Sequence, residues 1–140
     1  MVTDNILVDI LLGNVNPSGK LSITSASVKD IRFIEQFGGI DKTRYVDRVY
    51  VGYRFFDNGK IEPLFLFGFG KSYNDFEMKV KEVSSKEKEK VTIDITVKNI
   101  GEYPGKEVVQ IYVSPPQQNK DKLYQSLFSF KKTKLLKPEE

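Results

Sequence analysis

The sequence predicts a mainly β protein: a partial immunoglobulin-like β-sandwich, preceded by a short α/β segment and an aromatic linker. Apolar and polar residues alternate with period two over residues 75–83, 91–99 and 107–114, as in half-buried strands. Turn-forming or charged segments separate these runs at the spacing of antiparallel sandwiches. One amphipathic helical pattern precedes them, near the start of the chain.

Residues 1–25 are predicted to form a helix, a turn and a strand. In "TDNILVDILLGN", Thr3 or Asp4 can cap a helix whose apolar residues share one face, and Gly13 stands where a helix would end. The following "NPSG" favours a turn. The alternation in "KLSIT", residues 20–24, then predicts a short strand.

Residues 26–73 are predicted to form an extended linker. "RVYVGYRFFD", residues 48–57, is rich in β-branched and aromatic residues and predicts a strand-like run, which "DNG" at 57–59 then turns. "IEPLFLFGFGKSYNDF" follows, with aromatic side chains around two glycines. These rings could fill a local core, but few neighbouring elements occur in the sequence to cover them.

Residues 74–140 are predicted to form the sandwich itself. Strands are expected over 75–83, 91–99, 107–114 and, more weakly, 126–136, with a charged flexible connection at 84–90 and a loop at 115–122. An immunoglobulin-like sandwich has about seven strands. With four candidates, one apolar face should stay open to water, which predicts poor solubility or self-association.

Composition narrows the possible chemistry of the 140 residues. The chain has no histidine and no cysteine, which excludes a Ser-His-Asp triad within the chain, a disulfide framework and a thiolate metal site. No transmembrane segment or signal peptide is predicted, and the localisation stays unknown. Residues 120–137 hold six lysines, but without an arginine cluster or a nucleic-acid motif they read as a solvated face.

Three long motifs in order resemble the C-terminal part of family 3 glycoside hydrolases, the β-glucosidases and β-xylosidases. "VDILLGNVNPSGKLSIT" is similar to the end of that family's α/β sandwich domain. "VYVGYRFFDNGKIEPLFLFGFGKSYNDF" resembles the linker that follows it. "VKNIGEYPGKEVVQIYVSPP" and "LLKPEE" resemble the start of its fibronectin-III-like domain, with Glu139 where glycine is usual.

The resemblance implies part of a retaining β-glycosidase, which hydrolyses O-glycosyl bonds of non-reducing-end sugars and requires no metal or other cofactor. The family's nucleophile aspartate and acid/base glutamate lie in regions that these motifs do not cover. We therefore assign no catalytic residue and expect a structural, accessory role. The alternative is a non-catalytic β-sandwich module for binding or protein interaction. Independently of the resemblance, the change to period-two alternation after residue 74 predicts a domain boundary at about residues 70–76.

Candidate functional residues lie in the linker. Tyr53, Arg54, Phe55 and Asp57 could contact a sugar, although core packing, an ion pair and a turn role explain them at least as well. Domain-junction packing is predicted for five aromatic residues: Phe65, Phe67, Phe69, Tyr73 and Phe76. "GFGKS" does not have the spacing of a phosphate-binding loop.

The expected partners follow from the open apolar faces. The chain should bind a separate catalytic chain or a second copy of itself, and the resemblance implies carbohydrate as the ligand of the whole enzyme. Neither nucleic acid nor membrane is expected.

Overall fold

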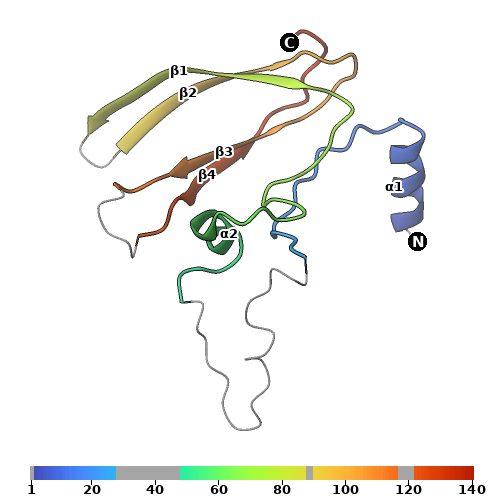
Figure 1. The fold of residues 1–140 in the computed structure, drawn as a ribbon. Helices are drawn as coiled ribbons and strands as arrows, with labels where there is room; N and C mark the ends of the chain where they lie inside the picture. The colour runs from blue at the N-terminus through green and yellow to red at the C-terminus, as the bar shows by residue number, and fades with distance from the viewer. Residues whose placement is uncertain (1, 28–47, 88–89, 117–121) are drawn as a thin grey trace, which may run out of the picture. The chain divides into compact units, whose positions relative to one another are not determined.

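The computed structural model describes residues 2–27, 48–87, 90–116 and 122–140 (Figure 1). Within these ranges it has two helices and four strands. The chain divides into two compact units, residues 1–19, 71–109 and 131–140 in unit 1 and residues 20–70 and 110–130 in unit 2. Each unit is described by itself. The predicted domain boundaries at residues 25 and 73 remain a prediction.

The helix predicted at the start of the chain is confirmed in unit 1. α1 spans Val2–Leu11, and Gly13 then adopts a φ of 77°, a left-handed conformation that glycine tolerates at a helix end. The backbone N–H of Gly13 donates to the Ile10 carbonyl, and that of Asn14 donates to the Asp9 carbonyl. This helix lies far below the length needed to cross a membrane, as does α2 described below; no other helix occurs in the described ranges.

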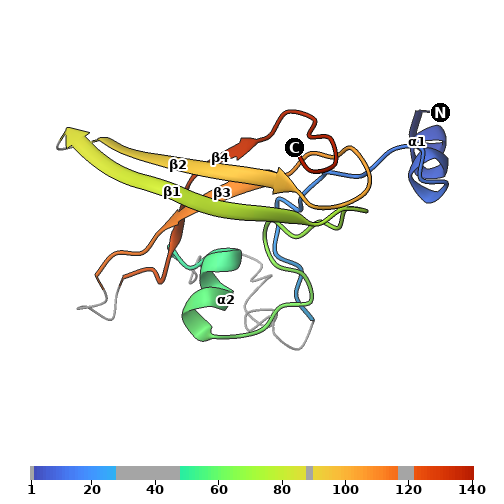
Figure 2. The same ribbon diagram turned by 90° about the horizontal axis from the view of Figure 1, so that it is seen from above.

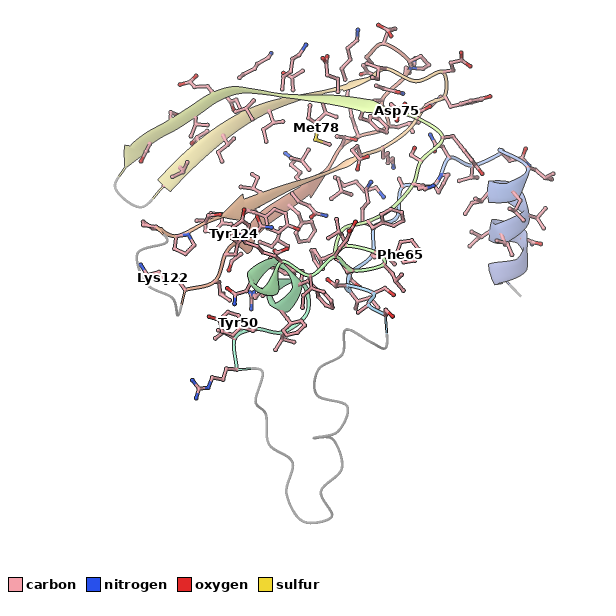
Figure 3. The ribbon with its side chains drawn as sticks, in the orientation of Figure 1. Tyr50, Phe65, Asp75, Met78, Lys122 and Tyr124 are labelled. Carbon is pink, nitrogen blue, oxygen red and sulfur yellow. The ribbon has the colours of Figure 1, made fainter. Side chains whose placement is uncertain are left out.

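A long antiparallel hairpin in unit 1 confirms the first two predicted strands. β1 spans Phe76–Glu87 and β2 spans Lys90–Asn99, and the two run side by side along their length (Figure 2). The pairs Met78–Val97, Val80–Ile95 and Val83–Ile93 place apolar side chains on one face. Met78 points to this side of the ribbon in Figure 3.

A β-bulge keeps that face continuous. The register shifts between Val80 and Glu82, so that Lys81 is an extra residue in β1. Strict alternation from Phe76, Met78 and Val80 would send Val83 to the opposite face. With the bulge, Val83 stays on the apolar side, opposite Ile93. The predicted flexible connection at 84–90 is correspondingly wrong: β1 continues to Glu87, because the bulged ladder carries the pairing onward to Glu87–Lys90.

The remaining two strands pair with each other. β3 spans Val108–Val113 and β4 spans Ser126–Lys132, which confirms both predictions, including the weaker one. Next to the start of β3 and the end of β4, Thr133 N–H donates to the Glu107 carbonyl, 2.9 Å away. With two two-stranded sheets, the mainly β class and the partial sandwich are confirmed. The predicted loop at 115–122 falls largely outside the described residues.

The strand-like run predicted at residues 48–57 is wrong, since the chain forms helix α2 at Tyr53–Gly59. Gly52, with a φ of 60°, precedes the helix, and Lys60 ends it in the left-handed conformation. Helical spacing brings Tyr53 and Phe56 to one side, and Phe56 is one of the most buried side chains of the described residues. Burial of this ring overrides the β propensity of the aromatic residues.

The strand predicted at residues 20–24 is also wrong. Within unit 2 the segment meets the aromatic run through separate bonds: Leu21 N–H donates to the Phe69 carbonyl, and Gly68 N–H donates to the Leu21 carbonyl, each at 2.8 Å. A single antiparallel bridge then joins Ser25 to Phe65. Two contact points are too few for a ladder, although they tie residues 20–25 to the aromatic run.

Little apolar surface is buried. Among the described residues, Phe56 and Leu136 are the large apolar side chains that are buried. By contrast, Val80 and Val83 are 64% and 62% exposed, and Phe128 and Phe130 are 78% and 69% exposed. The predicted open apolar faces are therefore present on the described strands.

Candidate functional site

Several acidic side chains in the described ranges bind nitrogen donors. Glu77 pairs with Lys79 at 2.9 Å, and Asp9 accepts a hydrogen bond from Asn14 at 3.2 Å. Lys134 donates to Glu140 and holds the pKa of that carboxyl below its ordinary value, the opposite of what a glycosidase acid requires. No group of three acidic residues that could hold a metal occurs in the described part of the chain.

Three asparagine side chains form an amide network in unit 1. Asn99 is fully buried, and its Nδ2 donates to the carbonyls of Tyr103 at 2.8 Å and Leu136 at 3.1 Å, while its Oδ1 accepts from Gly101 N–H at 3.0 Å. Asn74, also buried, uses its amide to pair with both backbone groups of Tyr103.

Asn16 extends this network to the first motif. Its Oδ1 accepts from the Ser72 hydroxyl at 2.8 Å and from Tyr73 N–H at 3.0 Å, and its Nδ2 donates to the Pro104 carbonyl at 3.2 Å. A Cβ on Gly105 would come within 2.9 Å of the amide nitrogens of both Asn16 and Asn74, so glycine is needed there. Sequence reasoning matched Asn16 and Asn99 to motifs but missed their joint role, because a contact over 88 residues leaves no local pattern.

Two of the predicted sugar contacts bind the start of β4 in unit 2. The Tyr53 hydroxyl accepts from Leu127 N–H at 2.8 Å, and Asp57 Oδ2 accepts from Gln125 Nε2 at 2.9 Å. The Tyr53 ring lies 5.1 Å from the ring of Phe67 and 5.9 Å from that of Tyr112. Burial, and then the nearby Tyr53 and Asp57, raise the pKa of Tyr112. α2 is thereby fastened to β4 through side chains of the linker motif.

The other two predicted sugar contacts are Arg54 and Phe55, which lie between Tyr53 and Asp57 in the sequence. Arg54 has a buried Nε that finds no hydrogen-bond partner in the described residues, and its guanidinium lies 5.6 Å from the centroid of the Tyr53 ring. Phe55 packs edge-on against Phe56, with centroids 5.3 Å apart. A sugar contact by these four residues remains a prediction.

The aromatic run forms contacts inside unit 2. The rings of Phe65 and Phe69 lie 4.9 Å apart, and Phe65 is labelled in Figure 3. Between them Gly68 has a φ of 80°, and a Cβ there would meet the Gln110 amide at 2.3 Å. In unit 1, Tyr73 donates its hydroxyl to the Ile10 carbonyl, and Phe76 begins β1. The predicted role of these aromatic residues at a domain junction remains a prediction.

An open cleft of about 970 Å³ lies within unit 1. Its walls come from the end of α1 with the loop after it, from Tyr73, from the loop that carries Tyr103–Lys106, and from residues at and just after the end of β4. Asn16 and Tyr103 line the cleft and also take part in the amide network. The network therefore holds part of the cleft walls in place. Sequence reasoning gave no signal for this cleft.

A scan against protein-family models gave no match. The β-glucosidase of Ruminococcus albus is 41% identical over 133 residues, which are 94% of this chain and 14% of that protein. β-Glucosidase 3B from Thermotoga neapolitana, solved in complex with α-D-glucose, superposes with a TM-score of 0.88 at 38% identity, covering 96% of this chain and 19% of that one. For the GH3 β-glucosidase of Bifidobacterium adolescentis the TM-score is 0.85 at 31% identity, with 96% and 20% covered.

The chain thus spans at most about a fifth of the length of these relatives. Sequence and fold agree over nearly the whole chain, and the segments that agree include the three motifs found in the sequence. The chain therefore belongs to the family 3 glycoside hydrolases and corresponds to a C-terminal part of their β-glucosidases.

Proposed function

We propose that this chain is a structural, non-catalytic part of a retaining β-glycosidase, which supports a catalytic part that it does not contain. The observation that carries the proposal is the exposure of apolar side chains on strands whose pattern is that of a core, such as Val80, Val83, Phe128 and Phe130. Faces of this kind are covered in stable proteins. The relatives, which are about five or more times longer, have the additional chain that could cover them.

The contacts of the acidic residues support the absence of a catalytic pair. Retaining glycosidases use two carboxylates about 5–5.5 Å apart, one of them with a raised pKa. Asp57 accepts from an amide, and Glu139 and Glu140 bind lysines. Hydrolysis of β-glucosides would then be a property of the assembled enzyme.

A chimera tests this proposal. In the Ruminococcus albus β-glucosidase, the 133 matched residues would be replaced by those of this chain. We expect the chimera to hydrolyse an aryl β-glucoside, a variant with the segment deleted to have lost most of this activity, and the purified chain to show none. Turnover by the purified chain at the rate of the chimera would contradict the proposal. A chimera no more active than the deletion would contradict it as well.

The alternative, a freestanding interaction module, is favoured by the exposed Phe128 and Phe130 on β4. It predicts that the purified chain binds a partner tightly without a catalytic part. The chimera separates the two functions, because an interaction module has no reason to restore hydrolysis.

A further inference from the structure

The cleft in unit 1 has an apolar floor. Leu11, at the end of α1, and Leu12, just after it, are 73% and 70% exposed, and Val15, Leu135 and the ring of Tyr103 add to the apolar lining. These side chains belong to three segments that are distant in the sequence, yet they meet in one concave surface. Contiguous apolar surface in a concavity is typical of a site that binds another polypeptide.

The charged residues that line the cleft are all basic. Lys106 and Lys132 both line it, and none of the lining residues is acidic. Lys132 uses one donor on the Ser18 carbonyl at 3.0 Å, which leaves further ammonium hydrogens for another acceptor. An apolar floor with two cations at its edge complements a segment that carries apolar side chains and a carboxylate.

The walls are held in place before any partner arrives. Asn16 fixes the loop after α1 to Tyr73 and to the Pro104 carbonyl, and the Asn74 amide fixes Tyr103. A site preorganised in this way loses little conformational entropy on binding. The chain itself has a net charge of +3, which disfavours a second copy as the occupant of a basic cleft.

We infer that this cleft receives an apolar segment with an acidic side chain, supplied by the catalytic part of the enzyme. The inference rests on the proposed function and names the contact through which the two parts hold together. Lys106 and Lys132 bind the carboxylate, and Leu11, Leu12 and Leu135 cover the apolar side chains of the segment.

Cross-linking of the chimera tests the contact directly. A carbodiimide joins an amine to a carboxylate that is already in contact with it, so peptide mapping should find Lys106 or Lys132 joined to an Asp or Glu outside the replaced segment. Cross-links from these lysines to acids of the chain itself, or none, would overturn the inference.

A charge reversal at Lys106 tests how much the cleft contributes to the thermal stability of the chimera. In the chimera, Lys106→Glu should shorten the half-life of aryl β-glucosidase activity at elevated temperature roughly three- to tenfold, and high salt should reduce the difference. Lys106 makes no described hydrogen bond, so the thermal unfolding of the free chain should stay unchanged. The matched control is Lys90→Glu, at the exposed start of β2 and away from the cleft.

The outcomes separate the two proposals. An inactive chimera contradicts the proposed function, whereas an active chimera in which Lys106→Glu behaves like Lys90→Glu contradicts only the cleft inference. If Lys106→Glu instead changes the self-association of the free chain in sedimentation, a second copy occupies the cleft and the inference is wrong.

Discussion

The side-chain amide of Asn99 forms hydrogen bonds with backbone groups at the end of β2, where the hydrogen bonds between β1 and β2 stop. The side chain is fully buried and serves two carbonyls and one N–H, while its own backbone N–H donates to the Glu140 carbonyl at 2.9 Å. Buried polar groups that lose their partner cost about 1–3 kcal/mol each. A single residue therefore controls the stability of the whole end of the hairpin.

Asn99→Ala should lower the free energy of unfolding by roughly 1–3 kcal/mol, because the N–H of Gly101 loses its acceptor. The carbonyls of Tyr103 and Leu136 each lose one of two donors and keep the other, from Asn74 and Gly105 respectively. Urea unfolding followed by circular dichroism measures the change. Asn14→Ala, which removes one exposed amide bond to Asp9, should cost less than about 1 kcal/mol. Equal losses in the two variants would show that the buried network is not what stabilises this region.

The pKa of Glu140 gives a pH-dependent prediction. Lys134 lowers this pKa, so the charged carboxylate stabilises the fold above the ordinary value of 4.5, and the contribution is lost as the pH falls through the lowered value. In Lys134→Ala the pKa of Glu140 should rise toward 4.5, measured by NMR titration of the carboxyl group. In Lys131→Ala, an exposed neighbour outside this pair, it should not move. An unchanged Glu140 titration in Lys134→Ala would argue against the ion pair.

At the scale of the element, α2 shows what the sequence predicts and what it does not. β1 to β4 follow from alternation, which is local and regular, and the helix α1 follows from its apolar period. Residues 48–57 also read as a strand, but α2 depends on burial of Phe56 and on contacts from Tyr53 and Asp57 to residues about 70 positions later. Tertiary contacts of this range leave no trace in a short window.

Tyr53→Phe should weaken the attachment of α2 to β4. The variant keeps the ring contacts with Phe67 and Tyr112 but leaves the N–H of Leu127 without its acceptor, at a cost of roughly 1–3 kcal/mol. Hydrogen exchange at the Leu127 amide should become markedly faster, while exchange within β2 stays the same. Tyr50→Phe, with the same loss of a hydroxyl, serves as the control. Unchanged protection of Leu127 would mean that Tyr53 does not hold the strand.

The bulge at Lys81 marks a second limit of prediction. Strict alternation predicts an apolar face of β1 made of Phe76, Met78 and Val80, and the charged residues 84–90 predict a flexible connection. One extra residue in the ladder restores Val83 to that face and lets the pairing continue to Glu87. The cleft, the amide network and the fastening of α2 were likewise not predictable, since each joins segments that are distant in the sequence.

At the scale of the whole molecule, exposed apolar side chains on the described strands agree with the proposal that the chain is part of a larger enzyme. Val80, Val83, Phe128 and Phe130 are each at least 62% exposed. Contiguous apolar surface of this kind is usually covered by another part of the protein or by a partner.

Replacing Val80 and Val83 by threonine should make the free chain more soluble at little cost in stability. Both side chains are more than half exposed, so the change should cost less than about 1 kcal/mol while it reduces binding of a hydrophobic dye and self-association in sedimentation. Ile95→Thr, at a less exposed position opposite Val80, should instead destabilise the hairpin. Undiminished dye binding in the double variant would mean that other residues form the surface responsible for self-association.

The three linked asparagines also bear on how the chain comes apart. Asn16 near the beginning, Asn74 and Asn99 in the middle, and the carbonyl of Leu136 near the end all belong to one bonded set. Opening any one member exposes the others to water, so these distant stretches should exchange their amide protons at a common rate, as a single cooperative block. A protease that trims the last few residues would consequently loosen the first turn after α1 as well.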